Sequence, residues 1–385
     1  MSILPKNYLL FENHSLLYYN ASKYKILRTM CMKLLVSALE PSSNLHLKEV
    51  LKHTQYVEDN IELFGIFDKS LGTPLYDTSG MAVMGVIDAL KKIRWAYKAM
   101  DEMVVLAKNV DKILLMDSSA FNLPLAKKLK IAYPNKEIIY YILPQIWASR
   151  PKRALKLEQY CDKLLGILPF EREYYPQGKA QYIGHPLLDE IDVPKNIHSR
   201  EAETKGCIAF MPGSRKSEIS RLMPIFLELR RKFGNNIRPL LVIPPSFDRN
   251  KIARFYKGNR EFEVVRDTHE ALKRSEFAFI CSGTATLEAA LIGTPFTLAY
   301  IAKKIDFFIG TKLLGIKQVG LANIILTKSN GTTLHKELLQ EEVTVDNLLK
   351  EYYDTDKHKF ADKAKELREY LGHGSSQNVT KIIMQ

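Results

Sequence analysis

The chain has 385 residues, a length that favours two domains over a single core. Its 46% hydrophobic and 26% charged residues are typical of a folded protein, which excludes wholesale disorder. The formal net charge of +13 indicates a polyanionic partner, and nucleic acid, an anionic membrane surface and a phosphorylated substrate all fit it.

Cysteine and histidine usage argues against disulfides and zinc. The four cysteines form no C-x-x-C pair, and Cys207 and Cys281 lie in apolar runs, so buried free thiols are expected there. None of the nine histidines has a metal-binding spacing. We therefore predict neither a metal site nor a cofactor. No apolar stretch approaches the roughly 20 residues that span a bilayer.

Residues 1–31 differ from the rest because they are tyrosine-rich and lack periodicity. They also lack the long apolar core and small-residue cleavage site of a signal peptide. We expect a poorly ordered extension, or upstream sequence that precedes a natural start at Met30 or Met32.

From residue 33 onward, apolar runs that indicate buried strands alternate with amphipathic stretches that indicate helices. The runs are residues 33–39, 61–67, 113–116 and 138–143, and then 207–211, 240–243, 277–281 and 296–300. Such alternation predicts parallel sheets covered by helices on both faces. We predict an α/β protein of two doubly wound Rossmann-like domains that face a cleft. The domains are expected at 32–190 and 191–385, with a hinge at 185–205.

The first of two candidate phosphate-binding loops follows the strand predicted at 207–211. Gly213 permits a tight turn, and apolar residues then repeat at helical spacing over 219–233. Ser214 and Arg215 therefore lie near a helix N-terminus, where free N–H groups and the helix dipole favour a phosphate. An arginine there can bind two phosphate oxygens at once. An ordinary strand–turn–helix with a surface arginine is the alternative.

The second loop follows the strand predicted at 277–281. Its small residues Ser282, Gly283 and Thr284 allow backbone N–H groups to approach a diphosphate. Glu288 lies one helical turn after Thr284, on the same face. We predict that the helix N-terminus holds a diphosphate while Glu288 accepts ribose hydroxyls. The alternative is a buried helix in which Glu288 has another partner.

Competing nucleotide motifs are absent from the sequence. No G-x-G-x-x-G follows a strand and no G-x-x-x-x-G-K-[ST] occurs, which removes the main support for a dehydrogenase or a P-loop enzyme. One D-x-D, from Asp354 to Asp356, lies in a hydrophilic, lysine-rich segment. We interpret it as a solvated turn, with a metal–diphosphate site as the alternative.

Several further motifs occur in the order that is found in lipid-A-disaccharide synthases. They are V-M-G (83–85), M-D-S-S-A-F-N (116–122), I-Y-Y-I-L-P-Q-I-W-A-S-R (139–150), L-P-F-E (168–171), I-G-H-P (183–186) and L-A-N (321–323). Each motif is weak alone, but together with the two loops the ordered set is specific. The sequence from residue 32 to about 340 resembles this family.

The resemblance implies a GT-B fold and a definite reaction. UDP-2,3-diacylglucosamine would donate its sugar to 2,3-diacylglucosamine 1-phosphate, giving a β-1,6-linked disaccharide and UDP. A β product from an α-linked donor implies inversion by a single in-line displacement. That step needs a base for the acceptor hydroxyl and stabilisation of the departing diphosphate. The two loops can stabilise the diphosphate without a metal.

Asp117 is the predicted base. It ends the strand at 113–116, at the sheet edge where open α/β proteins bind ligands, and the family motif has an aspartate there. The family usually has a second aspartate three residues later, where this chain has Ala120, so Asp117 is the retained carboxylate. Glu40 is an alternative base, and a carboxylate that caps the following helix is the structural alternative.

The resemblance also implies an acceptor side and one more donor-side residue. The acceptor-side residues are Glu40, Ser42, Asn122, Gln145, Trp147, Arg150 and His185, and the added donor-side residue is Asn323. The loop at 39–44 departs from the family's G-E-x-S-G-D, because both glycines and the acid are replaced, so its role stays open. A hinge or cleft-lining role is favoured over catalysis for His185. Packing is the alternative for Trp147, and a surface charge is the alternative for Arg150.

Residues 83–100 are predicted to form a helix that docks on the anionic inner membrane from the cytoplasmic side. A helical wheel places Val83, Val86, Ile87, Leu90, Ile93, Tyr97 and Met100 in one apolar stripe. Lys91, Trp95 and Lys98 lie off that stripe, as suits the headgroup layer. The alternative is a helix packed on its own domain with a solvated basic face. A homodimer is left open.

Three other functions remain as alternatives. A lipid-linked peptidoglycan precursor transferase and a UDP-GlcNAc 2-epimerase share the GT-B fold and the UDP-GlcNAc chemistry. A basic nucleic-acid-binding protein would account for the charge. However, the chain lacks an arginine-rich stripe interleaved with aromatic residues, so no nucleic acid partner is predicted.

Overall fold

The computed structural model describes residues 31–54, 61–79, 89–147, 151–191, 204–245, 247–302 and 318–385. These residues form two compact units. One unit holds the chain up to Pro144 together with Lys156–Leu165 and Ser376–Gln385, and the other holds Gln145–Leu155 and Gly166–Ser375. Apart from Cys31, the predicted N-terminal extension lies outside the described residues, as does most of the predicted hinge.

The first sheet has seven strands in the order β3-β2-β1-β4-β5-β6-β7. Its strands are β1 (Met32–Ala38), β2 (Ile61–Phe67), β3 (Tyr76–Asp77), β4 (Lys112–Met116), β5 (Glu137–Tyr141), β6 (Lys163–Gly166) and β7 (Ala180–Tyr182). The α-helices along this part of the chain are α1 (Pro41–Thr54), α2 (Ala89–Leu106), α3 (Ser119–Ala132), α4 (Arg153–Tyr160) and α5 (Pro186–Glu190). The pairings from β3 through to β6 are parallel, as the sequence predicts.

The second sheet has six strands in the order β10-β9-β8-β11-β12-β13, and all of its pairings are parallel. Its strands are β8 (Cys207–Met211), β9 (Arg238–Val242), β10 (Glu263–Val265), β11 (Phe277–Ile280), β12 (Phe296–Tyr300) and β13 (Lys336–Leu339). The α-helices here are α7 (Lys216–Phe233), α8 (Arg249–Phe255), α9 (Thr268–Arg274), α10 (Thr284–Ile292), α12 (Leu321–Asn330), α13 (Val345–Asp354) and α14 (Lys357–Leu371).

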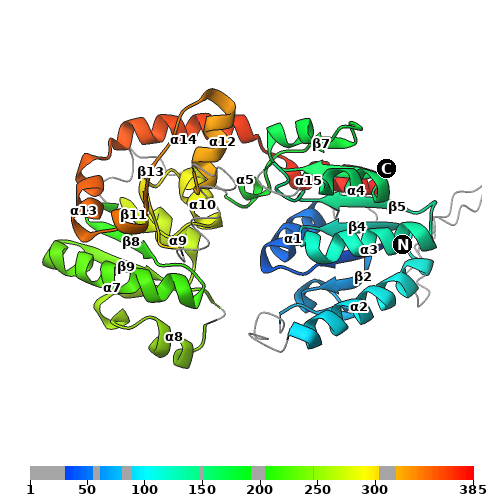
Figure 1. Cartoon of the computed structure of the whole chain (residues 1–385), viewed down its shortest axis with the longest axis horizontal. Helices are drawn as coiled ribbons and strands as arrows, with labels where there is room; N and C mark the ends of the chain where they lie inside the picture. Colours follow the sequence, from blue (N-terminus) through cyan, green and yellow to red (C-terminus); the bar gives the residue numbers. More distant parts are fainter. Residues whose placement is uncertain are drawn as a thin grey trace, which may run out of the picture. The chain divides into compact units, whose positions relative to one another are not determined.

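Successive residues of the second sheet point into two different cores, as the period of a strand requires. On β8, Ile208 and Phe210 pack with the apolar faces of α7 and α13. Ala209 and Met211 pack on the opposite face with α10, α12 and α14 (Figure 1). Because both faces are covered, the strand is apolar at every position, which is why it could be recognised as a continuous run.

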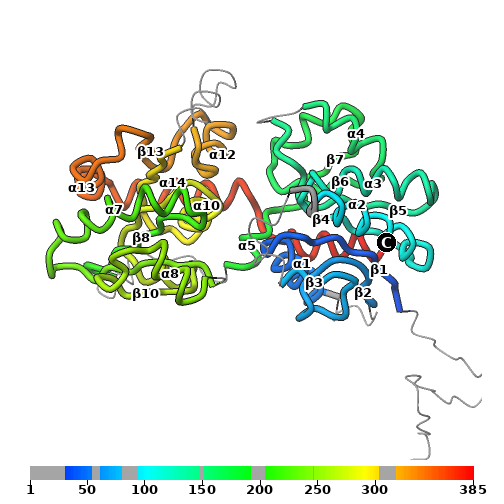
Figure 2. The backbone as a smooth tube through the Cα atoms, turned by 60° about the horizontal axis from the view of Figure 1, so that its bottom comes forward, coloured from blue at the N-terminus to red at the C-terminus, as the bar shows by residue number. Residues whose placement is uncertain are grey.

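The unit boundaries differ from the predicted domain boundaries at three places, and one of them is Gln145–Leu155, which belongs to the second unit. The C-terminal helix α15 (Ser375–Met384) belongs to the first unit, where the Thr380 hydroxyl donates to the Val50 carbonyl at 3.0 Å. Figure 2 shows this helix in red beside the blue α1. Residues 166–190 belong to the second unit, because Phe170 and Leu187 join the core that contains α10 and α14.

In each sheet, the strand order reverses direction at one point, which is called the switch point. The first sheet reverses between β1 and β4, and the second between β8 and β11. In open α/β sheets, ligands bind outside the carboxyl ends of the strands at such a switch point. Glu40 and Asp117 follow β1 and β4, whereas Gly213 and Gly283 follow β8 and β11. The main predicted site residues therefore lie at the two switch points.

Candidate functional site

The backbone at the end of β4 has an unusual conformation. Asp117 has φ of 48° and Ser118 has φ of 37°, and Ile142, which directly follows the neighbouring strand β5, has φ of 65°. Left-handed backbone disfavours residues that carry a Cβ, and a β-branched isoleucine there is a genuine outlier. Such residues cost about 1–3 kcal/mol each and persist where the surroundings hold them, often at functional sites. The sheet edge at Asp117 is therefore strained and braced.

Asn122, from α3, is the main brace. Its side-chain amide donates to the carbonyls of Met116 at 2.8 Å and of Asp117 at 3.1 Å. Its oxygen accepts the Ser37 hydroxyl at 2.6 Å, and the Tyr140 hydroxyl donates to the Asp117 carbonyl as well. Asn122 is fully buried. The structure thus places this predicted acceptor-side residue beneath the site, holding the backbone of Asp117.

The Asp117 carboxyl is partly buried, and burial raises its pKa above the ordinary value of 3.8. The backbone N–H of Ser118 works against this shift, the negative charge of Glu40 adds to it, and His46 works against it. A carboxylate with a raised pKa is a stronger base. The position and the electrostatics both suit a general base.

Two predicted acceptor-side residues, Glu40 and Ser42, lie at the end of β1. Both are exposed, and the helix α1 begins between them at Pro41. The Ser118 hydroxyl donates to the Glu40 carboxylate at 3.3 Å. Glu40 and Asp117 therefore share one edge of the first sheet.

Asn44 replaces the family's aspartate in this loop, and it joins three strand ends. Its side-chain amide donates to the carbonyls of Ala38 and Glu40, both at 2.9 Å, and to the Thr78 hydroxyl at 3.1 Å. Its oxygen accepts the backbone N–H of Asp68 at 2.7 Å. An aspartate has no N–H to give to these carbonyls. Asn44 therefore stabilises this loop through hydrogen bonds that an aspartate could not donate. The sequence alone left the role of the loop open.

The first donor loop, after β8, is tightly packed around Gly213. This residue has φ of 99°, and a Cβ there would lie 2.6 Å from Glu218 Oε2 and 3.2 Å from Cys281 Sγ. The Tyr256 hydroxyl donates to the Gly213 carbonyl at 3.0 Å. Arg215 caps α7, with its N–H 3.2 Å from Glu218 Oε2 and its Nη1 2.7 Å from Oε1.

This arrangement leaves the end of the loop accessible. The side chain of Arg215 is 77% exposed although one of its nitrogens pairs with Glu218, and Ser214 is exposed. A guanidinium has five N–H donors in a fork, so this pairing leaves donors for a phosphate. The predicted phosphate-binding role of Arg215 is thus compatible with its ion pair.

The second donor loop, after β11, is open where the first is crowded. Gly283 has φ of 154° and ψ of −169°, a region that is almost restricted to glycine. No atom of the described residues lies within 4 Å of the position of a Cβ. Gly283 precedes α10, and among the described residues no side chain caps this helix. The neighbouring Thr284 is exposed, whereas the Ser282 hydroxyl donates to the Val319 carbonyl at 3.1 Å. An uncapped helix N-terminus behind a glycine favours an anion.

Glu288 lies one turn into α10 and has a partner that the sequence analysis missed. Its Oε2 is 3.4 Å from Nε2 of His269, which is on α9. The pKa of His269 is raised, first by its hydrogen bond with Glu288. The Glu288 side chain is 18% exposed, so solvent and a ligand can still reach it.

Asn323 is buried and its amide is used within the second unit. It donates to the His335 carbonyl at 3.0 Å and to Glu337 Oε1 at 2.8 Å, and it accepts the Leu334 N–H at 2.8 Å. Glu337 in turn accepts the Val319 N–H at 2.8 Å. The structure therefore assigns Asn323 to an internal network that fixes the start of α12, and not to the surface of the donor loops.

The remaining predicted acceptor-side residues lie in the second unit. Gln145 is exposed. Trp147 packs edge-on against Phe170, with ring centroids 5.5 Å apart, which favours the packing alternative. His185 is buried and caps α5, where its Nδ1 accepts the Leu187 N–H at 3.3 Å. These contacts favour structural roles for Trp147 and His185, and Arg150 lies outside the described residues.

The orientation predicted for α2 needs correction. Trp95 packs between Tyr76 and Phe121, at centroid distances of 5.4 and 6.1 Å, so its ring belongs to the first unit rather than to a lipid headgroup layer. Ile93 and Tyr97, in contrast, are 54% and 57% exposed. The predicted apolar stripe is not one face of the folded helix, because Met100 is buried whereas Ile93 and Tyr97 are exposed. Contacts with β3 and α3 cover Trp95 instead.

Lys98 is exposed and lies 3.7 Å from Glu102. Residues 83–88 and the side chain of Lys91 lie outside what the structure describes. None of the described helices combines the length and apolar character needed to cross a bilayer. Within the described ranges, no three His, Cys, Asp or Glu side chains gather into a metal site. Asp354 ends α13 and Asp356 caps α14, so the D-x-D motif lies in the connection between two helices.

Two doubly wound parallel sheets, each with its own switch point, are the architecture of the GT-B fold. The fold is similar to that of S. aureus MnaA in complex with UDP, with a TM-score of 0.61 over 92% of this chain and 96% of that one, at 14% identity. It is also similar to MurG of Acinetobacter baumannii, with a TM-score of 0.53 over 92% and 99% of the two chains, at 13% identity. At such identities the likeness shows the fold alone.

Sequence comparison identifies the family. The lipid-A-disaccharide synthetase profile matches residues 34–384. The lipid-A-disaccharide synthase of Helicobacter acinonychis (strain Sheeba) is 46% identical over 361 residues, which cover 91% of this chain and 97% of that protein. The chain belongs to the lipid-A-disaccharide synthetase family and is a glycosyltransferase of lipid A biosynthesis. The resemblance drawn from the motifs is confirmed.

Proposed function

We propose that this glycosyltransferase transfers the sugar of UDP-2,3-diacylglucosamine to the 6-hydroxyl of 2,3-diacylglucosamine 1-phosphate. The observation that carries the proposal is the contrast between the two switch points. One presents a carboxylate with a raised pKa at Asp117, and the other presents an uncapped helix N-terminus at Gly283 with Arg215 nearby in the same sheet edge.

The reaction is a single in-line displacement. The acceptor 6-oxygen attacks the anomeric carbon of the donor while Asp117 takes the hydroxyl proton. The bond from the anomeric carbon to the β-phosphate oxygen breaks, its electron pair leaves with UDP, and the anomeric configuration inverts. The negative charge that grows on the diphosphate meets the first N–H groups of α10 and the guanidinium of Arg215. Glu288 accepts the ribose hydroxyls.

Acceptor dependence tests this function. The full chain is incubated with UDP-2,3-diacylglucosamine, and UDP release is measured with and without the acylated sugar phosphate. We expect release only when the acceptor is present, together with a disaccharide 1-phosphate product. A donor that is consumed equally well without acceptor would contradict the proposal and favour a 2-epimerase.

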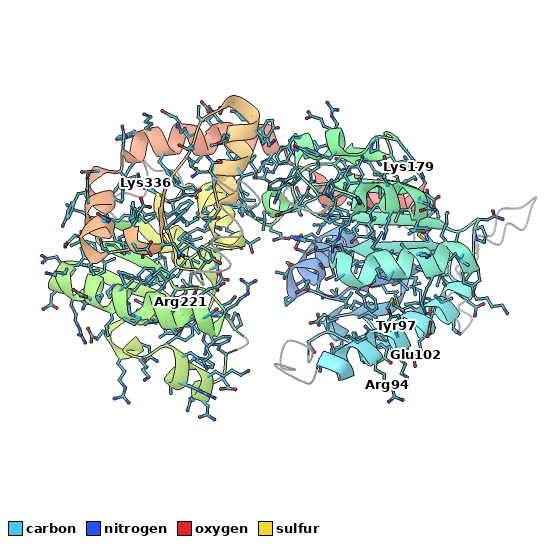
Figure 3. All side chains as sticks on the ribbon, in the orientation of Figure 1. Arg94, Tyr97, Glu102, Lys179, Arg221 and Lys336 are labelled. Carbon is cyan, nitrogen blue, oxygen red and sulfur yellow. The ribbon has the colours of Figure 1, made fainter. Side chains whose placement is uncertain are left out.

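We further propose that α2 holds the enzyme on an anionic membrane surface, on the cytoplasmic face where acylated substrates reside. Ile93 and Tyr97 are exposed apolar side chains, and the exposed Arg94 and Lys98 are their neighbours in sequence on the same helix. Figure 3 labels Arg94 and Tyr97 on this helix. Each basic residue near such a surface contributes about 1 kcal/mol, and salt screens this attraction.

Sedimentation with vesicles of phosphatidylglycerol and phosphatidylethanolamine tests this attachment. We expect an Ile93→Ser, Tyr97→Ser variant to sediment several-fold less than the wild type at low salt. Tyr353→Ser is the matched control, because Tyr353 is 72% exposed but lies on α13 in the second unit. Equal sedimentation of the α2 variant and the control would remove α2 from the membrane contact.

A further inference from the structure

Glu288 is held by a side chain from another helix. His269 lies in the first turn of α9, and its Nε2 is 3.4 Å from Glu288 Oε2. The two side chains are 29% and 18% exposed, so the pair is shielded from bulk water but not sealed. Electrostatic and hydrogen-bonding interactions are stronger at such a position than on an open surface.

The helices that carry this pair are fixed to each other at a second point. The Thr294 hydroxyl, just beyond α10, donates to the Leu272 carbonyl in the last turn of α9 at 2.7 Å. Asp267 caps the other end of α9 by accepting the Glu270 N–H at 2.9 Å. His269 is therefore presented to Glu288 by a helix whose two ends are held.

The charges around His269 favour its protonated form. The pKa of His269 is raised by the hydrogen bond to Glu288 and by its negative charge, and Asp267 and Glu190 add to the shift, while burial opposes it. A cationic imidazole next to Glu288 makes the contact a charge-assisted hydrogen bond.

We infer that His269 is a positioning residue that orients the Glu288 carboxylate for the hydroxyls of a nucleotide ribose. The imidazole engages Oε2 and leaves Oε1 for the ligand. Without it, a three-torsion side chain on α10 must be ordered by the ligand itself, which weakens binding. The inference rests on the proposed function, because it takes Glu288 as the ribose contact.

A consequence is discrimination by the ribose hydroxyls. A site built to bind hydroxyl groups rejects an analogue that lacks them, because its polar groups are then left without partners. The wild type should therefore prefer UDP to 2′,3′-dideoxy-UDP, and part of that preference should depend on His269.

Calorimetric titration of the full chain with these two nucleotides tests the inference. We expect His269→Ala to weaken UDP binding by roughly three- to tenfold, the scale of one hydrogen bond, and to leave dideoxy-UDP binding unchanged. His269→Gln should restore most of the loss, because the amide can donate in place of the imidazole. The turnover number at saturating donor should hardly change, since His269 touches no reacting atom.

Three further variants separate the outcomes. Adding His269→Ala to Glu288→Ala should weaken UDP binding no further, because the imidazole acts through the carboxylate. Glu270→Ala is the control on the same helix, since Glu270 pairs with Arg274 at 2.9 Å. The inference would be overturned if a folded His269→Ala variant bound UDP as tightly as the wild type while Glu288→Ala bound it less tightly. A wild type that bound both nucleotides equally would instead contradict the ribose contact of the proposed function.

Discussion

The two switch points have the same topology and opposite chemistry. In the first sheet, the residues after β1 and β4 bring the carboxylates of Glu40 and Asp117 to the carboxyl ends of these strands, here called the first edge. In the second sheet, the turns after β8 and β11 bring backbone N–H groups and Arg215 to the corresponding edge. Strand order therefore fixes where a ligand meets each sheet, and the first residues beyond the strands decide which charge it meets.

The two edges also differ in how they accommodate unusual backbone. Asp117 and Ser118 adopt left-handed φ angles although both carry a side chain, and Asn122 holds them there. At the switch point of the second sheet, the positive φ angles fall on Gly213 and Gly283, for which such angles carry little penalty. A switch point that must present a carboxylate cannot use glycine at that position, so the first switch point stores strain that the second avoids.

Loss of the carboxylate at the first edge should have the largest effect. Asp117→Asn is expected to lower the turnover number by roughly a hundredfold or more, the scale of a lost general base. UDP affinity should stay unchanged, because the donor loops lie in the other sheet. Steady-state kinetics and titration with UDP measure the two quantities separately.

Glu40→Gln is the matched control for this prediction, because Glu40 shares the edge and pairs with Ser118. We expect turnover within a few-fold of the wild type. A reversal, in which Glu40→Gln abolishes turnover and Asp117→Asn does not, would make Glu40 the base.

Changes at the second edge should have the opposite kinetic signature. Arg215→Ala and Glu288→Ala are each expected to weaken UDP binding by about tenfold, the scale of a hydrogen bond to a charged group. Arg231→Ala is the control, because Arg231 lies at the other end of α7 and pairs with Glu261. UDP affinities equal to that of the wild type in both variants would remove the donor loops from the proposal.

The pH dependence distinguishes the two edges further. Because burial raises the pKa of Asp117, the acidic limb of kcat/KM should fall at a pH above 3.8, the ordinary value for an aspartate.

The same pKa shift affects stability, since the unfolded chain loses this proton at a lower pH than the native protein. Native stability is therefore lost as the pH rises through the folded pKa. Asp117→Asn, which has no proton to lose, should gain in melting temperature relative to the wild type as the pH rises above 3.8. A constant difference between their melting temperatures would show that Asp117 is not shifted.

Long apolar strands and strand-end residues could be predicted from the sequence. The strands expected at 61–67, 207–211 and 296–300 have those bounds in the structure, because strands covered on both faces are apolar throughout. Short strands such as β3 and β10 were not predicted, since two or three residues carry no periodic signal.

Partnerships between distant residues could not be predicted. Asn122 holds Ser37 from 85 positions away, and His269 reaches Glu288 from a different helix. Asn323 and Trp95 were placed on ligand and lipid surfaces, but each is held by contacts that only the folded chain creates. The sequence identifies which side chains follow a strand, whereas packing decides which of them face a ligand.

The difference in stored strain predicts opposite effects for two exchanges between glycine and a residue with a side chain. At the first edge, Ser118→Gly relieves a left-handed conformation that costs a non-glycine residue about 1–2 kcal/mol. The greater freedom of glycine in the unfolded chain removes about 0.5–1 kcal/mol of that gain, and the lost contact with the exposed Glu40 adds little. The net effect should be a rise in melting temperature of a few degrees at most.

At the second edge, Gly283→Ala should lower the free energy of unfolding by about 1–3 kcal/mol, because its φ of 154° and ψ of −169° are almost closed to alanine. In the part of the chain that the structure describes, no atom lies within 4 Å of the new methyl group, so this loss would come from the backbone and not from a clash. The added carbon also stands where the diphosphate is proposed to approach, so UDP binding should weaken in Gly283→Ala and stay constant in Ser118→Gly.

Thermal unfolding and UDP titration of both variants measure these effects. A fall in melting temperature for Ser118→Gly together with an unchanged Gly283→Ala would mean that the first edge stores no strain and that the contrast between the two edges lies in charge alone.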